Sequence, residues 1–151
     1  AGVAATAMTI LGIAAGFIKP AWGLAGERMP VRYPLAVSFL VVAASLVLLV
    51  YTREGWIIFL FPVIYGVGAG GLVTLSNLIW GDYFGRTFLG TIRGVFTPVS
   101  FVAHGLSPIF AGWMYDLSRS YDLAYLIFAG LLVAGGVGML FALPPKKKAT
   151  P

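Results

Sequence analysis

The sequence has no cysteine, only one histidine and no known catalytic motif, and these shortages narrow the possible functions. Without cysteine the chain can form no disulfide, no thiolate metal site and no cysteine nucleophile. The single histidine, His104, leaves no zinc-binding constellation. No G-x-S-x-G elbow occurs, so a membrane enzyme would lack a nucleophile, base and acid set. We therefore expect no catalytic residue, no metal and no cofactor.

Charge is scarce as well. Charged residues make up 10% of the 151 residues, whereas hydrophobic residues make up 60%, and the mean hydropathy is +0.95. A water-exposed surface needs more charge than this. The net charge of +5 does not indicate nucleic acid, because most basic residues sit in gaps between long apolar runs. The G-x-G-x-x-G pattern at 66–71 lies inside such a run and does not indicate a dinucleotide site.

Five of these apolar runs are long enough to cross a bilayer as helices. They predict an all-α membrane protein with one transmembrane domain, spans at about 1–18, 33–52, 56–80, 91–114 and 123–143, and a tail at 144–151. Lys19–Pro20 is expected to end the first span, and the second span is apolar enough all round to face lipid. The charged stretch 80–94 is expected to form a short loop at a membrane surface. A charged side chain at the bilayer centre would cost roughly 2.5 to 3.5 kcal/mol.

The basic residues divide unequally between the two ends of the spans. Two, Arg53 and Arg119, fall on one side, and eight fall on the other: Lys19, Arg28, Arg32, Arg86, Arg93 and Lys146 to Lys148. The positive-inside rule makes the side with eight cytoplasmic, which puts the tail inside the cell and residue 1 outside. We expect a multi-pass protein of the cell (inner) membrane. The chain opens in an apolar run without methionine or a signal-peptide pattern, which indicates a fragment.

The fourth span carries the most polar face of the protein. Thr97, Ser100, His104 and Ser107 follow a three-four-three spacing that places them on one side of a helix. His104 is the only titratable side chain expected deep in a span, so it is a candidate for binding substrate or relaying a proton. The alternative is a packing hydrogen bond to Ser100, Ser107 or another helix.

A second polar face is expected on the third span. Gly66, Gly70, Thr74 and Asn77 share one side of a helix, small at one end and polar at the other. Asn77 and Thr74 can line a substrate path or hydrogen-bond a neighbouring helix. Tyr65 can offer its hydroxyl to a ligand or serve in packing. Small residues at Gly12 and Gly16, and at Gly130, Ala134 and Gly138, allow another helix to approach closely, although glycine is common in membrane helices.

The loop after the first span resembles a motif of the major facilitator superfamily. Gly23-Leu-Ala-Gly-Glu-Arg28 followed by Arg32 is similar to the second copy of G-x-L-a-D-R-x-G-R-R, with Glu27 in place of the aspartate. Ala25 stands where the family has leucine, and Pro30 and Val31 stand where it has glycine and arginine. The resemblance implies that Gly23, Glu27, Arg28 and Arg32 bias one conformation. The alternative is a simple solvated loop charge.

A second resemblance covers the later part of the chain. The segments Tyr83-Phe-Gly-Arg86, Leu89-Gly-Thr-Ile-Arg-Gly94, Gly105-x-x-Pro108 and Tyr115-Asp116 are similar to the second-half signature of monocarboxylate and oxalate-formate porters. The five spans would then be the eighth to twelfth of twelve. The resemblance implies that the eighth, tenth and eleventh helices face a central cavity and that the ninth and twelfth are outer supports. It also implies that an N-terminal half and a seventh helix belong to the same protein.

These resemblances imply a secondary active transporter that moves a small organic anion, such as a monocarboxylate, by alternating access between two halves in a lipid bilayer. Protons are the candidate coupling ion. Asp82, Arg86 and Arg93 of the cytoplasmic loop can recruit an anion or act only as topology signals. The alternatives are a drug or amphiphile exporter of the same superfamily, and a five-helix scaffold or accessory subunit without transport activity.

Overall fold

The protein is all-α, as the sequence predicts. The structure, a computed structural model, describes residues 2–51, 55–84 and 89–142. These residues form α1 (Gly2–Arg28), α2 (Arg32–Tyr51), α3 (Ile57–Phe84), α4 (Leu89–Ser118) and α5 (Asp122–Phe141), with no strand among them. All five helices are long and apolar enough to cross a membrane.

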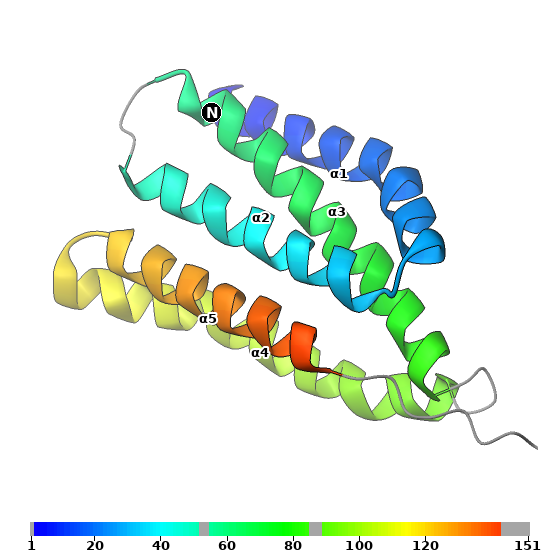
Figure 1. Cartoon of the computed structure of the whole chain (residues 1–151). Coiled ribbons are helices and arrows are strands. Elements are labelled where there is room, and N and C mark those ends of the chain that lie inside the picture. Colours follow the sequence, from blue (N-terminus) through cyan, green and yellow to red (C-terminus); the bar gives the residue numbers. More distant parts are fainter. Residues whose placement is uncertain (1, 52–54, 85–88, 143–151) are drawn as a thin grey trace, which may run out of the picture.

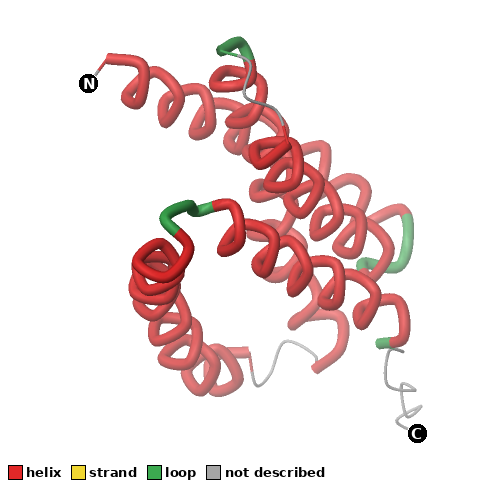
Figure 2. The backbone as a smooth tube through the Cα atoms, turned by 90° about the vertical axis from the view of Figure 1, so that its left-hand side faces the viewer, coloured by secondary structure: helices red, strands yellow, loops and turns green. Residues whose placement is uncertain are grey.

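Successive helices run in opposite directions, and α2 lies in the middle of the bundle (Figure 1). α2 packs against α3 on one side and α5 on the other, while α1 covers α3. α4 lies beside α5 and has few contacts with the other helices, as the view along the bundle shows (Figure 2). The core consists of two apolar clusters, one around Val31, Leu35 and Leu75 and one around Ala43, Leu46 and Ala129.

The first helix does not end at Lys19–Pro20, so this boundary prediction was wrong. α1 continues through Pro20 to Arg28. A proline inside a helix removes one backbone hydrogen bond, and here contacts with α3 hold the following turns. The indole N–H of Trp22 donates to the carbonyl oxygen of Val67 at 2.9 Å. Lys19 therefore lies inside a helix, about 13.5 Å from Arg28 along the helix axis at 1.5 Å per residue.

The connections on either side of α4 are shorter than the sequence predicts. Most of the predicted loop at 80–94 is helical, because α3 runs to Phe84 and α4 begins at Leu89. α4 also extends to Ser118, where Arg119 takes a left-handed conformation (φ 56°). The N–H of Arg119 donates to the carbonyl oxygen of Tyr115 at 2.7 Å, which closes the last turn of the helix. At the other end of the bundle the Tyr83 hydroxyl donates to the Ala142 carbonyl at 2.8 Å and joins α3 to α5.

Glycines let α3 approach two neighbours closely. A Cβ atom at Gly66 would lie 2.8 Å from the carbonyl oxygen of Leu11, and one at Gly70 would lie 2.7 Å from that of Ala15, both on α1. On the side toward α2, a Cβ at Gly68 would lie 3.0 Å from the backbone nitrogen of Val42. Gly66 and Gly70, the small residues of the face predicted on the third span, therefore allow α3 to pack closely against α1.

α2 exposes one stripe to its surroundings and buries its other sides. The exposed residues follow a helical spacing: Tyr33, Val37, Leu40, Ala44, Val47 and Tyr51. Ser38 and Ser45 are fully buried, and their hydroxyls donate to carbonyls of α2 itself at 3.0 Å and 2.7 Å. Although the helix is apolar all round, only this one stripe is exposed and can face lipid.

The other small-residue pairs make no close helix contact within the described part of the chain. A Cβ at Gly12, Gly16, Gly130 or Gly138 would meet nothing within 4 Å. α5 instead approaches α2 at Gly136, where a Cβ would lie 3.3 Å from the carbonyl oxygen of Ala36. Spacing alone did not show which glycines of α5 face a partner, because the rotation of a helix about its axis depends on its neighbours.

We expect Gly70→Ala to destabilise the protein, because the added methyl group would collide with the backbone of α1. Overpacking of this kind typically costs about 1–3 kcal/mol. Gly138→Ala is the matched control, since its methyl group would enter open space. The thermal unfolding midpoint of the purified full-length protein measures the difference. Equal midpoints for the two variants would contradict the packing described here.

Candidate functional site

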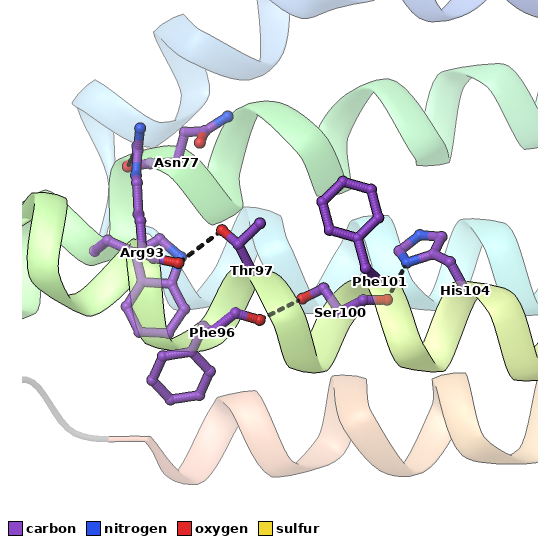
Figure 3. Close-up of a pocket in the computed structure, with 8 residues that line it drawn as sticks. Asn77, Arg93, Phe96, Thr97, Ser100, Phe101 and His104 are labelled. Atoms are coloured by element: carbon purple, nitrogen blue, oxygen red, sulfur yellow. Dashed lines mark hydrogen bonds between the residues drawn. The ribbon is translucent and has the colours of Figure 1, made fainter.

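A groove between α3 and α4 brings polar side chains of both helices together (Figure 3). Its volume is about 460 Å³, within the range of small-molecule sites. The lining comprises Asn77, Trp80, Arg93, Phe96, Thr97, Ser100, Phe101 and His104. Of the candidates predicted for the substrate path, the structure places Asn77, Ser100 and His104 in this groove.

The hydroxyl groups of α4 donate their hydrogens to their own helix. Thr97 donates to the Arg93 carbonyl at 2.6 Å, Ser100 to the Phe96 carbonyl at 3.1 Å, and Ser107 to the Ala103 carbonyl at 2.8 Å. Each hydroxyl oxygen keeps lone pairs that can accept a hydrogen bond. The hydroxyl groups on this face of α4 can therefore accept hydrogen bonds from a ligand. Hydrogen bonds to the ligand must be donated by other side chains.

His104 is oriented by a hydrogen bond within α4. Its Nδ1 lies 2.6 Å from the carbonyl oxygen of Ser100. Because a carbonyl can only accept, Nδ1 carries the hydrogen, and in the neutral ring Nε2 is then an acceptor. The bond to Ser100 is to its backbone and not to its hydroxyl, so it lies within one turn of α4 and does not join two helices. The ring is exposed and its Nε2 makes no hydrogen bond within the described residues.

A hydrogen bond between Arg93 and Asn77 crosses the groove. Nη2 of Arg93 donates to the backbone oxygen of Asn77 at 3.4 Å. The Asn77 side chain donates one amide hydrogen to the Val73 carbonyl at 2.8 Å. Its second amide hydrogen, its Oδ1 and the remaining N–H groups of Arg93 are open to a ligand.

The other candidates of α3 and α4 lie elsewhere. Tyr65 and Ser107 line a second cleft of about 600 Å³ between α2, α3, α4 and α5, which His104 also reaches. The Tyr65 ring packs on Phe61 at a centroid distance of 5.5 Å. Thr74 lines neither space, and its hydroxyl donates to the Gly70 carbonyl at 2.8 Å. His104 thus stands between a polar groove and a mainly apolar cleft.

The residues of the predicted conformational motif make no ion pair with one another. Glu27 and Arg28 are exposed at the end of α1, and nothing lies within 4 Å of a Cβ built on Gly23. Arg32 donates to the Tyr33 hydroxyl at 2.9 Å, and its guanidinium lies 4.7 Å from the centre of that ring. Asp82 is exposed near the end of α3. Arg86 lies outside the described residues.

Two features of this region were missed at the level of sequence. Lys19 was treated as a loop charge, yet it lies inside α1, exposed, on the same helix side as Gly12 and Gly16. The apolar segment that follows Pro20 was the available signal that the helix continues. The aromatic rings of Trp80, Phe96 and Phe101 were missed because only polar spacing was considered.

Comparisons with known proteins agree with this picture. The family profile of the Major Facilitator Superfamily matches residues 1–151. Monocarboxylate transporter 12 of Xenopus laevis is 36% identical over 67 residues, 44% of this chain and 15% of that protein. Monocarboxylate transporter 14 of Homo sapiens is 32% identical over 75 residues, 50% of this chain and 14% of that protein.

Monocarboxylate transporter 12-B of Danio rerio is 28% identical over 82 residues, 54% of this chain and 17% of that protein. The alignments thus span a small part of the length of these relatives, and no solved structure matches the chain. The relatives belong to the branch that the motifs at 83–116 indicated. The chain forms part of a multi-pass integral membrane protein and belongs to the Major Facilitator Superfamily.

Proposed function

We propose that the protein is a secondary active transporter that moves a small organic anion by alternating access, with the groove between α3 and α4 on the substrate path. The observation that carries this proposal is the convergence of Asn77 and His104 with Arg93, which lies near the first turn of α4, on one recess between two helices of membrane-spanning length. Ionisable and polar side chains at membrane depth are costly and typically mark substrate pathways. The names of the relatives support a carboxylate as the substrate.

The distribution of charge favours an anion. Arg93 borders the groove and Lys19 is exposed inside α1, and neither forms an ion pair within the described residues. The acidic side chains in the described part of the chain all lie within two residues of a helix end: Glu27, Asp82, Asp116 and Asp122. Positive side chains without acidic partners are complementary to a carboxylate, which arginine binds with two parallel hydrogen bonds.

We further propose an orientation and a coupling ion. The helix ends that carry Arg28, Arg32 and Arg93 lie at one end of the bundle, opposite the turn with Arg119 (Figure 1). The positive-inside rule assigns the first end to the cytoplasm. Protons are the candidate coupling ion, with His104 at the groove as the candidate carrier.

One observation favours the second candidate, an exporter of drugs or amphiphiles. The cleft of about 600 Å³ is lined mainly by apolar side chains, among them Leu46, Leu72 and Phe128. Carboxylate uptake and dye efflux, compared in vesicles that contain the full-length protein, distinguish the two functions. Efflux of uncharged dyes without any carboxylate transport would favour the exporter.

Replacing Lys19, which does not line the groove, tests whether a second cation helps to attract or hold the anion. We expect Lys19→Ala to lower the apparent affinity for a transported carboxylate about tenfold or more, because a hydrogen bond to a charged group is lost. Lys19→Arg, which keeps the charge, should retain much of the affinity. Uptake of labelled carboxylate into proteoliposomes measures both variants. If Lys19→Ala transports like the unchanged protein, Lys19 is not part of the anion path.

Single cysteines test whether the groove is in contact with water. The chain has no cysteine, so Asn77→Cys and His104→Cys introduce unique thiols within it. We expect both to react with a charged, membrane-impermeant thiol reagent and to be protected by a transported carboxylate. Val47→Cys, on the apolar stripe of α2, is the control that should remain unlabelled. Labelling of Val47→Cys alone would rule out the groove as an aqueous path.

A further inference from the structure

The apolar part of the groove is entirely aromatic. Trp80, Phe96 and Phe101 line it, and no Leu, Ile, Val or Met side chain of the described residues does so. This composition contrasts with the neighbouring cleft, whose lining includes Val42, Leu46, Leu72, Leu131 and Leu132. In a chain dominated by aliphatic residues, three rings around one recess indicate a preference for a flat, π-rich partner.

The rings lie beside a cation that can hold a carboxylate. The centroids of Trp80 and Phe96 lie 4.9 Å apart, so α3 and α4 each contribute a ring. Phe101 projects to the same side of α4 as Arg93, Thr97 and His104 (Figure 3). Arg93 and Phe101 are eight residues apart, about 12 Å along the helix axis at 1.5 Å per residue. The groove that both residues line has a volume of about 460 Å³, which is enough for a small molecule.

Phe96, Phe101, Arg93 and Asn77 have exposed surface or unused hydrogen-bonding groups for such a ligand. The Phe96 ring is 50% exposed and the Phe101 ring 74% exposed. Arg93 has one long hydrogen bond, to the Asn77 backbone at 3.4 Å, and its remaining N–H groups can bind a carboxylate in the bidentate manner. The second amide hydrogen and Oδ1 of Asn77 can bind a polar substituent. A lipid acyl chain is a poor occupant, because it would remove water from Arg93 without a polar partner in return.

We propose, on the basis of the function proposed above, that this groove selects aromatic carboxylates. The carboxylate binds Arg93, and the aromatic ring of the substrate packs against Phe96, Phe101 and Trp80 in offset or edge-to-face contacts. Asn77 and His104 form hydrogen bonds with polar substituents on the ring or side chain of the substrate. The preference for an aromatic over a saturated body then comes from these contacts, while the carboxylate contact is common to both kinds of acid.

A pair of acids of nearly equal size tests the proposal in the full-length protein reconstituted in proteoliposomes. Phenylacetate and cyclohexylacetate share the carboxylate and differ in the aromatic character of the ring. We expect phenylacetate to bind about three- to tenfold more tightly, the range expected for one or two aromatic contacts. Uptake of each labelled acid, with competition by the other, measures the ratio of their affinities.

Variants assign the preference to the groove. Phe101→Leu and Phe96→Leu should each reduce the ratio toward one by weakening phenylacetate binding, while cyclohexylacetate is little affected. Both rings are substantially exposed, so these changes should leave folding intact. Phe141→Leu, at a ring that is 79% exposed near the end of α5 and outside the groove, is the matched control and should keep the unchanged ratio.

The outcomes separate this proposal from the function on which it rests. If the protein transports both acids with equal affinity, or if Phe96→Leu and Phe101→Leu keep the original ratio, the groove does not select aromatic carboxylates and organic-anion transport stands. If the protein neither transports nor binds either acid, both the selectivity and the proposed function are wrong. Aromatic rings that only contact lipid headgroups would give the first of these results.

Discussion

The close approach of α3 to α1 and α2 is the contact on which the rest of the structure depends. Between membrane helices there is little hydrophobic driving force, so association depends on van der Waals packing and on small residues at the interface. Gly66 and Gly70 bring α3 against the backbone of α1, and Gly68 brings it against α2. α2 in turn packs on α5. Asn77 and Trp80 follow on the same helix, so this packing sets the position of one wall of the groove.

The opposite wall is built on a different principle. α4 contacts its neighbours lightly and exposes most of its side chains, and its polar groups are satisfied locally. The hydroxyls of Thr97, Ser100 and Ser107 donate hydrogen bonds to carbonyl oxygens four residues earlier in α4. These bonds remove the free-energy cost of unpaired donors in an apolar setting. The donors left for a ligand come mainly from Arg93 and Asn77. Few groups on this polar face of α4 can still donate a hydrogen bond, so the face can bind only ligands that match those few donors.

Lys19 shows how a helix boundary changes the interpretation of a charge. Placed at the end of a span, a lysine is a topology signal. Placed inside α1, it becomes an exposed cation within a helix of membrane-spanning length, where ionisable groups usually have a function. The difference depends on Pro20, which ends many helices but is accommodated here because Trp22 is tied to α3. A local rule about proline was overridden by a contact between residues 45 positions apart.

The sequence by itself determined the five apolar helices, the all-α class and the family, because each follows from the length of apolar runs and from short motifs read along the chain. The spacing of Thr97, Ser100 and His104 also predicted that these residues share one face of a helix, and all three line the groove. Only the tertiary structure decided that Gly66 and Gly70 face α1, that Thr74 lies outside the groove and that Trp80, Phe96 and Phe101 line it. Periodicity defines the faces of a helix, whereas the direction of each face depends on how neighbouring helices pack, and that packing is set by contacts between residues far apart in the chain.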